Sequence, residues 1–396
     1  MRIALATNFV APYRQPLFAA LAATPDWDLT VFCSCETEFD RRWAAPGALP
    51  FACRRSFNLS YRRRTQQANG TGVPDERTVH LPLGLLGDLL RQRPEVVIAD
   101  EFGARSAIAA LYTRLTRRPL LIWFYGTPHT ERDLPPARLR LRRALCRRAR
   151  AFIGMGSEAR RYLRSLGIAD ERIFDAPNAA GHLGEARTEN RAAVRAEFGV
   201  VGLCYLAAGR LVPFKGHAGL VAAWDAFCRR RSPLATLLLA GDGGERRALE
   251  RQVREAGLRN VRFAGHIEPP ELAGIYAAAD VFVFPTLGDP WGLVVNEALQ
   301  AGLPVVCSRY AGSAPDLIRD GRNGWIVDPL AAADLARGLE AAWDARDQLE
   351  PMRAEARASA ARLTIARMAA GFRNAVESSL LRSDAERCAT RLEVGR

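Results

Sequence analysis

The chain of 396 residues has almost no lysine, few methionines and histidines, and no long apolar run. Its longest apolar stretches, such as 120–125 and 237–241, are far shorter than the ~20 residues of a transmembrane helix, so no membrane span is expected. The eight cysteines form no Cys-x-x-Cys pair and no metal-ligand spacing, which argues against a disulfide framework and a zinc site. The first residues lack the apolar segment and cleavage site of a signal peptide, so we expect a cytoplasmic protein.

The positive charge is carried almost entirely by arginine and lies mainly in the first half of the chain. Of the 56 basic residues 55 are arginine, and Lys215 is the only lysine. Residues 1–200 carry a net charge of +11, whereas residues 201–396 carry +2. This imbalance favours an anionic partner for the first half, such as phosphate-bearing lipid, an anionic membrane or nucleic acid. A compositional drift towards arginine explains it equally well, but such a drift makes the site of the one retained lysine worth testing.

Short apolar runs alternate with helical segments, which is typical of parallel α/β architecture. The expected strands of the first half are 2–7, 28–33, 95–99, 119–125 and 151–155. The expected helices there are 15–23, 83–91, 104–115, 137–148 and 158–166. The polar stretch 35–79 is interpreted as an irregular insertion with one strand at 51–57.

The same alternation restarts after a segment without apolar periodicity. The expected strands are 204–208, 235–240, 261–263, 281–284 and 305–307, and the helices are 217–229, 245–255, 271–278 and 293–301. The pattern therefore predicts two doubly wound, Rossmann-like domains in series. Their predicted limits are 1–178, a linker at 179–190, 191–350, and a helical tail at 351–396.

The loop Gly209–Gly216 follows the first strand of the second domain and contains the single lysine. Open α/β sheets bind ligands at the carboxyl ends of their strands, which is where this loop lies. Arg210 and Lys215 are five residues apart and can converge on one anion, the arginine as a bidentate clamp and the lysine as a point charge. The alternative is an ordinary solvated loop.

A second polar element, Asp289–Glu297, joins the strand 281–284 to the next helix. Because the helix is expected to begin near Gly292, the amides of Trp291, Gly292 and Leu293 are predicted to point outward unpaired, as an anion and hydroxyl site. Asp289 and Glu297 bracket these amides and can hold the hydroxyls of a ribose and a hexose. The alternatives are a helix-capping Asp289 and a surface Glu297.

Three further glycine turns or strand ends occur in order: Ala240–Gly244, Phe263–His266 and Tyr276–Pro285. With these spacings, residues 209–306 resemble the C-terminal domain of glycosyltransferase family 4, retaining sugar transferases of the GT-B fold. The matching elements are the G-R-L-x3-K-G loop, the A-G-x-G turn, the F-x-G strand end, the Y-x-x-A-D-V-x-V-x-P strand, the acid-x7-E element and the A-G-L-P-V segment behind it. The resemblance implies two Rossmann-like domains that face a central cleft.

The resemblance also implies a donor site in the second domain. Arg210 and Lys215 would hold the diphosphate of a nucleotide sugar and stabilise the charge that develops on it as it leaves. Glu297 would bind the ribose hydroxyls and Asp289 the hexose hydroxyls. The family usually has Glu where this chain has Asp289, which leaves the identity of the donor open. The other expected donor contacts are Gly265, His266 and Ile267 beside the base, and Trp291, Gly292 and Leu293 beside the sugar and phosphate.

The first domain resembles the family less closely. Its loop 8–14 replaces a glycine-rich turn of many relatives, which makes Tyr13 and Arg14 candidate acceptor contacts; the alternative for Arg14 is a solvated residue at a helix start. His129 follows the strand 119–125, where relatives place a histidine that faces the donor hexose, and the alternative is a structural loop histidine. The expected catalytic residues are Asp289, His129, Arg210 and Lys215.

Family members transfer the sugar without a metal ion, and a donor phosphate oxygen is thought to take the acceptor proton. We therefore expect no metal and no cofactor, with a nucleotide diphosphate sugar as co-substrate. The Asp26-Trp27-Asp28 sequence has the Asp-x-Asp form of metal-dependent glycosyltransferases, but its place before an early strand indicates a turn.

The segment 138–150 is a strongly basic helix with Leu141 and Leu145 on one stripe. Basic amphipathic helices lie on anionic membranes, so this segment is either a membrane-docking face or a plain solvated face. Nucleic acid is not expected, because no aromatic stacking platform accompanies the arginines.

The sequence thus predicts a hexosyltransferase that acts on a lipid-linked, polysaccharide-precursor or other hydroxyl acceptor, with peripheral placement at the inner membrane face. One alternative is a GT-B-fold sugar-nucleotide epimerase, which would act without an acceptor and usually shows additional first-domain carboxylates that the sequence does not reveal. Another is an inactive homologue that binds a nucleotide sugar without transfer or hydrolysis. A dinucleotide dehydrogenase is disfavoured because no G-x-G-x-x-G follows either first strand.

Overall fold

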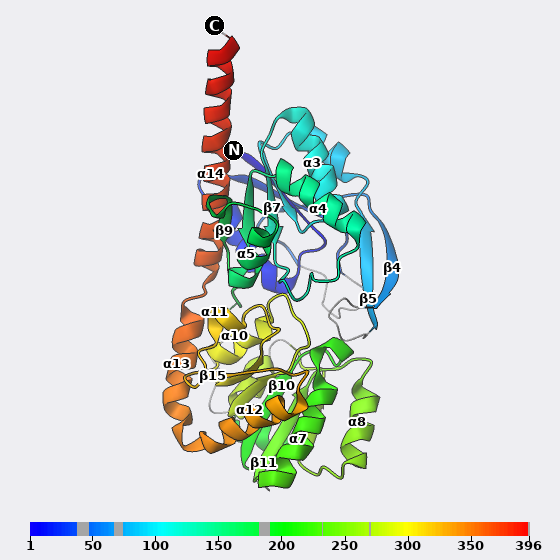
Figure 1. Ribbon diagram of the computed structural model, residues 1–396, viewed down its shortest axis with the longest axis vertical. Helices are drawn as coiled ribbons and strands as arrows, with labels where there is room; N and C mark the ends of the chain where they lie inside the picture. Colours follow the sequence, from blue (N-terminus) through cyan, green and yellow to red (C-terminus); the bar gives the residue numbers. More distant parts are fainter. Residues whose placement is uncertain (38–46, 67–73, 182–190, 232, 269–270, 395–396) are drawn as a thin grey trace. The chain divides into compact units, whose positions relative to one another are not determined.

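The structure is a computed structural model that describes residues 1–37, 47–66, 74–181, 191–231, 233–268 and 271–394 (Figure 1). The described residues form two compact units. Unit 1 comprises those of Met1–Ala68, Pro74–Gly181 and Ile365–Arg396, and unit 2 those of His182–Thr364. Each unit is built around its own parallel sheet.

Unit 1 contains a seven-stranded sheet in the order β3-β2-β1-β6-β7-β8-β9. All neighbouring strands that pair in this sheet are parallel. The central strands are apolar at nearly every position, since helices cover both faces of a parallel sheet. Its strands are β1 (Arg2–Thr7), β2 (Asp28–Cys33), β3 (Ala52–Arg55), β6 (Val96–Asp100), β7 (Leu120–Phe124), β8 (Ala151–Gly154) and β9 (Ile173–Asp175).

The helices of unit 1 come from both ends of the chain. They are α1 (Gln15–Ala22), α2 (Leu85–Gln92), α3 (Ala104–Thr116), α4 (Pro136–Arg148), α5 (Gly156–Ser165) and α14 (Ile365–Val394), with short 3-10 turns η1 (Pro12–Arg14) and η2 (Asp170–Arg172). The C-terminal α14 packs against α1, β7, β8 and β9. Phe372 of α14 is fully buried, and its ring lies 5.1 Å from the Trp123 ring of β7.

Unit 2 contains a six-stranded parallel sheet in the order β12-β11-β10-β13-β14-β15. Its strands are β10 (Leu203–Ala208), β11 (Ala235–Ala240), β12 (Val261–Gly265), β13 (Val281–Phe284), β14 (Val305–Ser308) and β15 (Gly324–Val327). Its helices are α6 (Arg191–Glu197), α7 (His217–Arg231), α8 (Arg246–Glu255), α9 (Leu272–Ala278), α10 (Leu293–Gln300), α11 (Ala314–Leu317), α12 (Ala332–Asp344) and α13 (Leu349–Ala361), with 3-10 turns η4 (Pro213–Lys215) and η6 (Arg346–Gln348). Tyr205 and Ala207 of β10 pack with buried leucines and valines of β11 and β13 and with Trp224 and Phe227 of α7 in one core.

The predicted fold class of two doubly wound sheets is confirmed, and the predicted strands agree with the structure to within two residues at each end. The interpretation of 35–79 as irregular with one strand was wrong. Besides β3, this stretch contributes β4 (Leu59–Gln66) and begins β5 (Pro74–Leu81), which pair as an antiparallel hairpin. The short edge strands β9 and β15 were also missed, because strands of so few residues carry little periodicity.

The predicted tail 351–396 is helical, but it is divided between the two units. Helix α13 lies in unit 2, whereas α14 belongs to unit 1. Of the predicted linker 179–190, residues 182–190 lie outside the described part of the chain. Within the described residues, no helix has the length and apolar content needed to cross a bilayer.

Candidate functional site

The predicted donor residues lie where the order of strands reverses in the sheet of unit 2. From β10 the chain moves outward to β11 and β12, and it then returns to β13 on the other side of β10. Ligands of open α/β sheets bind at such a switch point, beside the carboxyl ends of the two strands. The loop Gly209–Gly216 follows β10, and the loop 285–292 follows β13.

Backbone contacts hold these two loops together. The Phe214 carbonyl accepts hydrogen bonds from the Leu287 amide (2.8 Å) and the Thr286 hydroxyl (3.2 Å). Gly216 has a φ of +75°, and a Cβ there would lie 2.0 Å from the Pro285 carbonyl oxygen. Only glycine allows both this conformation and this approach, so the end of one loop is fixed against the start of the other.

The single lysine forms an ion pair across the two loops. Lys215 Nζ lies 2.5 Å from Asp289 Oδ2, and the two side chains are only 16% and 15% exposed. Burial alone would raise the pKa of Asp289, but the charge and hydrogen bond of Lys215, with backbone hydrogen bonds, lower it. Asp289 is therefore ionised at neutral pH and accepts hydrogen bonds. The anion that Lys215 contacts within the chain is this carboxylate.

The prediction of unpaired amides ahead of α10 was wrong in part. The Trp291 amide donates to Asp289 Oδ1 at 3.0 Å, and the Gly292 amide also hydrogen-bonds this carboxylate. Asp289 thus binds amides of the loop just before α10, whereas the N-cap of the helix is Gly292 and no side chain caps it, so the helix-capping alternative for Asp289 is not confirmed. Gly292 has a φ of +87°, and a Cβ there would lie 2.4 Å from the Phe284 ring.

The Trp291 side chain does not face solvent. Its indole is 3% exposed, and Nε1 donates a 2.7 Å hydrogen bond to Asn296 Oδ1. The predicted contribution of Trp291 to the site is thus confined to its backbone. The neighbouring Leu293 begins α10 and is half-buried.

Arg210 and Lys215 both lie beside the ring of Phe214. The Arg210 guanidinium carbon is 5.7 Å from the ring centroid, and Lys215 Nζ is 5.5 Å from it. Aromatic faces attract cations electrostatically. The ring therefore helps to hold two positive charges at one edge of the sheet, which favours a polyanionic ligand.

Glu297 lies in the second turn of α10, and a buried tyrosine positions it. Tyr276 Oη donates to Glu297 Oε2 at 2.8 Å from α9, and Tyr276 is fully buried. Burial raises the pKa of Glu297, while the tyrosine hydroxyl partly opposes this by stabilising the carboxylate. The sequence did not predict this role of Tyr276, although the residue begins the Y-x-x-A-D element.

The expected base-binding backbone lies at the end of β12. Gly265 has a φ of +76°, and its carbonyl accepts a 2.6 Å hydrogen bond from the Gly241 amide, which follows β11. His266 is exposed, and its Nε2 lies 3.3 Å from Glu268 Oε1. Ile267 is half-buried beside it. These residues share the carboxyl edge of the sheet with the Lys215–Asp289 pair.

Two buried polar residues near the pair were missed by the sequence analysis. His217 begins α7, is 2% exposed, and has an Nδ1 with no hydrogen-bond partner among the described residues. Burial, with a smaller effect of Lys215, lowers the pKa of His217 to about 4, so the ring is neutral. Ser313 is fully buried, its amide donates to the Trp291 carbonyl, and its hydroxyl also has no partner in the described chain.

Unit 1 carries a second polar cluster, at the switch point between β1 and β6 of its own sheet. Asp100 Oδ2 accepts hydrogen bonds from the Thr7 hydroxyl (2.8 Å) and from Arg14 Nη1 (3.0 Å). The Asp100 and Arg14 side chains are 1% and 12% exposed. The interpretation of Arg14 as a solvated residue is therefore excluded. Asp100 Oδ1 is buried without a partner in the described residues.

Aromatic rings enclose the Arg14 guanidinium. Its carbon lies 4.5 Å from the Trp123 ring centroid, 5.2 Å from that of Tyr125 and 6.0 Å from that of Tyr13. The predicted pair of Tyr13 and Arg14 is thus brought together. Tyr13 is only half-buried, so this side of the cluster is partly accessible to solvent.

Glu101, directly after Asp100, has an unusual backbone. Its φ is +60°, a conformation that non-glycine residues rarely adopt and that costs about 1–3 kcal/mol. Burial, with the charges of Asp100 and Glu131, raises the pKa of Glu101 to about 7. Neither carboxylate was predicted, although two successive acids at the end of a buried strand were a visible signal.

His129 lies in the loop that follows β7 in unit 1. Its Nδ1 is 2.9 Å from Arg132 Nη1. Because arginine can only donate, Nδ1 accepts and the neutral ring carries its proton on Nε2. His129 is half-buried, in a turn that hydrogen bonds between Thr127 and Thr130 stabilise.

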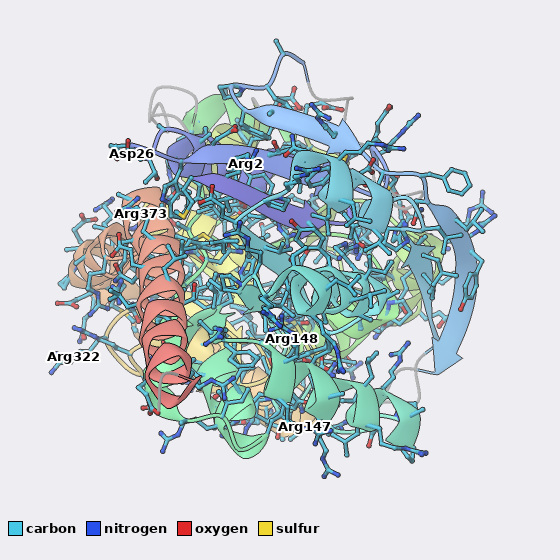
Figure 2. All side chains as sticks on the ribbon, turned by 90° about the horizontal axis from the view of Figure 1, so that it is seen from above. Arg2, Asp26, Arg147, Arg148, Arg322 and Arg373 are labelled. Carbon is cyan, nitrogen blue, oxygen red and sulfur yellow. The ribbon has the colours of Figure 1, made fainter. Side chains whose placement is uncertain are left out.

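The basic helix predicted over 138–150 is α4, and its apolar stripe faces inward. Leu145 is 3% exposed, and Arg142 is 8% exposed with a 2.6 Å hydrogen bond to the Tyr162 hydroxyl. Arg147, near the end of α4, is exposed (Figure 2). The other exposed arginines of this helix are Arg138, Arg140 and Arg143. The outer face of α4 is therefore cationic, with no apolar stripe of its own.

The Asp26-Trp27-Asp28 sequence forms a turn, as predicted. Asp26 has a φ of +65°, and the Trp27 amide bonds the Thr24 carbonyl before β2 begins at Asp28. Among the described residues, no group of three or more His, Cys, Asp or Glu side chains is arranged to hold a metal ion.

Two protein-family models match the chain: a glycosyl transferase 4-like domain over residues 10–179 and glycosyl transferases group 1 over residues 202–359. Glycogen synthase of Mycobacterium tuberculosis is 37% identical over 172 residues, which are 43% of this chain and 39% of the relative. D-inositol 3-phosphate glycosyltransferase of Nocardia farcinica is 32% identical over 241 residues, 58% of this chain and 53% of the relative. The chain thus spans about two fifths to one half of the length of these relatives.

Solved structures resemble both units. Anabaena HepE in complex with UDP and glucose has a TM-score of 0.73 at 20% identity, over 96% of this chain and 100% of that one. Sucrose-phosphate synthase of Thermosynechococcus elongatus has a TM-score of 0.70 at 20% identity, over 99% and 100%. Two doubly wound parallel sheets of this kind define the GT-B class of glycosyltransferase folds. Within this class, the chain belongs to the GT4-like glycosyltransferase family.

Proposed function

We propose that this protein is a retaining, metal-independent glycosyltransferase that moves a hexose-type sugar from a nucleotide diphosphate sugar to a hydroxyl acceptor. The observation that carries this proposal is the Lys215–Asp289 pair, which joins the two loops at the switch point of unit 2. A diphosphate bound there would contact the cations Arg210 and Lys215, and sugar hydroxyls would contact the ionised carboxylate of Asp289. The matches to sugar transferases and to a structure that contains UDP and glucose support such a donor.

In this proposal the diphosphate is held by Arg210 and Lys215. Both cations stabilise the charge that develops on the leaving nucleoside diphosphate, and fixed charges of this kind supply a large part of the catalytic effect of many enzymes. Both oxygens of Asp289 already accept internal hydrogen bonds, and each has a further lone pair with which it accepts a hexose hydroxyl. Glu297, oriented by Tyr276, binds the ribose hydroxyls. A donor phosphate oxygen takes the acceptor proton, so no enzymic nucleophile and no cofactor are needed.

The cluster around Asp100 in unit 1 is proposed to bind the acceptor. Buried, unpartnered Asp100 Oδ1 can accept a hydroxyl hydrogen bond, and Tyr13 and Arg14 border it. We also propose that His129 contacts the donor hexose. We propose a lipid-linked or polysaccharide-precursor acceptor at the cytoplasmic membrane face, to which the exposed arginines of α4 add an electrostatic attraction.

The test is an incubation of the full chain with a panel of nucleotide sugars and with lipid-linked and oligosaccharide acceptors. Acceptor-dependent release of one nucleoside diphosphate, unchanged by EDTA, is expected, and NMR of the product should show the anomeric configuration of the donor. Loss of activity in EDTA would contradict the metal-independent route. An inverted anomer would contradict retention.

The same incubation tests the epimerase alternative. Asp100 and Glu101 are carboxylates of the first unit, a feature that epimerases of this fold usually show. An epimerase would convert the nucleotide sugar into its epimer without any acceptor. The proposed transferase should leave the nucleotide sugar unchanged until an acceptor is added.

A further inference from the structure

The hairpin β4–β5 of unit 1 exposes a row of large apolar side chains. The register pairs Leu59 with Leu81 and Tyr61 with Val79, so these residues share one face of the ribbon. The exposed fractions are 67% for Phe57, 51% for Leu59, 51% for Tyr61, 36% for Leu81 and 55% for Leu83. In both views the hairpin lies at the margin of unit 1 (Figures 1 and 2).

The opposite face of this hairpin carries polar side chains. Asn58 and His80 are half-buried, and Asn58 Nδ2 lies 3.2 Å from His80 Nδ1. Ser60 and Arg62, on the same face as His80, are exposed, so polar and apolar side chains of this hairpin both reach solvent. Single exposed apolar residues are ordinary, but a contiguous exposed apolar face usually marks a contact surface.

The charge around this face identifies the kind of partner. Residues 52–66 contain five arginines and no acidic residue, and Arg54, Arg55 and Arg62 are exposed. The partner strand β5 adds Asp75, Glu76 and Arg77, so residues 52–66 and 74–81 together carry a net charge of +4. Leucine and aromatic side chains bordered by arginine are the composition of surfaces that enter the interface of an anionic bilayer. Because α4 of the same unit also presents arginines outward, an acidic surface would be attracted to both elements.

We propose that the β4–β5 hairpin docks unit 1 on an anionic lipid bilayer. Phe57, Leu59, Tyr61, Leu81 and Leu83 enter the headgroup region, and the neighbouring arginines contact lipid phosphates. This docking deepens the membrane placement in the proposed function, because it names the element that enters the bilayer, and it does not depend on sugar transfer. It supplies the apolar contact that α4, with its leucines turned inward, does not provide.

The experiment measures flotation of the full chain with two kinds of vesicle. One is pure phosphatidylcholine and the other contains about 30% phosphatidylglycerol, each at about 0.1 M and 0.5 M NaCl. The test variant is Leu59→Ser/Leu83→Ser. The matched control is Leu234→Ser/Leu330→Ser, which removes two leucines of similar exposure, 66% and 51%, from unit 2. Phe57→Ser/Tyr61→Ser is a second, independent test variant.

We expect the unchanged chain to bind anionic vesicles, at least about tenfold more weakly at the higher salt concentration. Both hairpin variants should bind at least about tenfold more weakly than the control variant, since apolar burial drives interfacial insertion. Three results would overturn the proposal: no binding by the unchanged chain, equal binding by hairpin and control variants, or equal binding to neutral vesicles. A hairpin-dependent dimer in sedimentation velocity, without vesicle binding, would assign the face to a second copy instead.

Two further measurements distinguish docking by the hairpin from docking by α4 and from the proposed nucleotide binding. Arg140→Gln/Arg143→Gln tests α4, and loss of binding in this variant alone would contradict docking by the hairpin. Stabilisation of the hairpin variants by nucleoside diphosphates should equal that of the unchanged chain. A variant that retains this stabilisation but loses vesicle binding supports the docking, whereas absence of nucleotide binding in all variants would count only against the proposed function.

Discussion

At the residue scale, the single lysine of the chain is placed where its charge has the greatest effect. Lys215 lies at the switch point of unit 2, pairs with Asp289, and is mostly buried. A drift towards arginine that spared this position is understandable on physical grounds. A lysine is a compact point charge, whereas the planar fork of an arginine requires more room and a different hydrogen-bond geometry.

We predict that Lys215→Ala weakens binding of the cognate nucleoside diphosphate by about 10–100-fold, because a hydrogen bond to a charged group contributes about 1.5–3 kcal/mol. Titration calorimetry on the full chain provides the measurement. Arg251→Ala, which removes an exposed cation of α8 in the same unit, is the control and should leave the affinity unchanged. Unaltered affinity in Lys215→Ala would remove this residue from the donor site.

The Lys215–Asp289 pair also predicts a pH dependence of stability. The pKa of Asp289 is lower in the folded chain than its ordinary value, so ionisation of this group favours folding. Its contribution is complete above the ordinary aspartate pKa of about 3.9 and is lost as the pH falls through the lower, folded-state pKa. The difference in stability between the unchanged chain and Asp289→Asn should therefore be constant near neutral pH and shrink in acid. Thermal unfolding across this range checks it, and a difference that grows in acid would contradict it.

For Glu101 we predict the opposite pH dependence of stability. Its pKa is raised to about 7, so the unfolded chain loses this proton at a lower pH than the folded chain does. Glu101 therefore destabilises the fold progressively as the pH rises from the ordinary glutamate range to about 7. We predict that Glu101→Gln raises the melting temperature at pH values above 7 and has little effect near pH 4. An effect of equal size at both ends of this range would show that Glu101 does not titrate as described.

At the scale of elements, apolar runs bounded by glycine and proline predicted the central strands well. Strands β1, β2, β11 and β13 were predicted with their observed bounds, since buried parallel strands are apolar throughout. The hairpin β4–β5 was missed because its apolar residues are exposed and its strands are rich in arginine. Hydrophobic periodicity predicts a strand when its apolar residues are buried in the core of the chain. It does not predict a strand whose apolar residues face solvent.

The tail of the chain illustrates a different limit. Its helical composition was visible, but composition does not say which sheet a helix covers. Helix α14 returns to unit 1, where Gly371 approaches the backbone of Asp175 so closely that a Cβ would lie 2.2 Å from its carbonyl oxygen. This contact depends on tertiary packing and leaves no local signal.

We predict that Phe372→Ala destabilises unit 1 by about 3–5 kcal/mol, because the lost ring is fully buried against Trp123. Differential scanning calorimetry of the full chain should show a lower transition for unit 1 with little change for unit 2. Leu381→Ala, at a position of the same helix that is 72% exposed, is the control. A Phe372→Ala variant as stable as this control would mean that α14 is not part of the core of unit 1.

At the scale of the whole chain, the two units present polar residues at the switch points of their respective sheets. The unit 2 site could be predicted because its residues lie in glycine-bounded loops with a family-specific spacing. Its internal pairing could not, since Lys215 and Asp289 are distant in sequence and only the order of strands brings them together. Arg14 was predicted as a site residue, but its contact with Asp100 was not, because Thr7, Arg14 and Asp100 come from β1, η1 and β6.

The central claim is that unit 2 binds a nucleotide sugar at the switch point between β10 and β13. The most direct measurement is the thermal shift of the full chain with UDP, GDP, ADP and dTDP, in the presence and absence of EDTA, repeated with Glu297→Ala and with the control Glu255→Ala from the exposed end of α8. We predict stabilisation by one nucleotide, unaffected by EDTA, retained in the control variant and lost in Glu297→Ala. Stabilisation by none of the nucleotides, or equal stabilisation of both glutamate variants, would contradict the account.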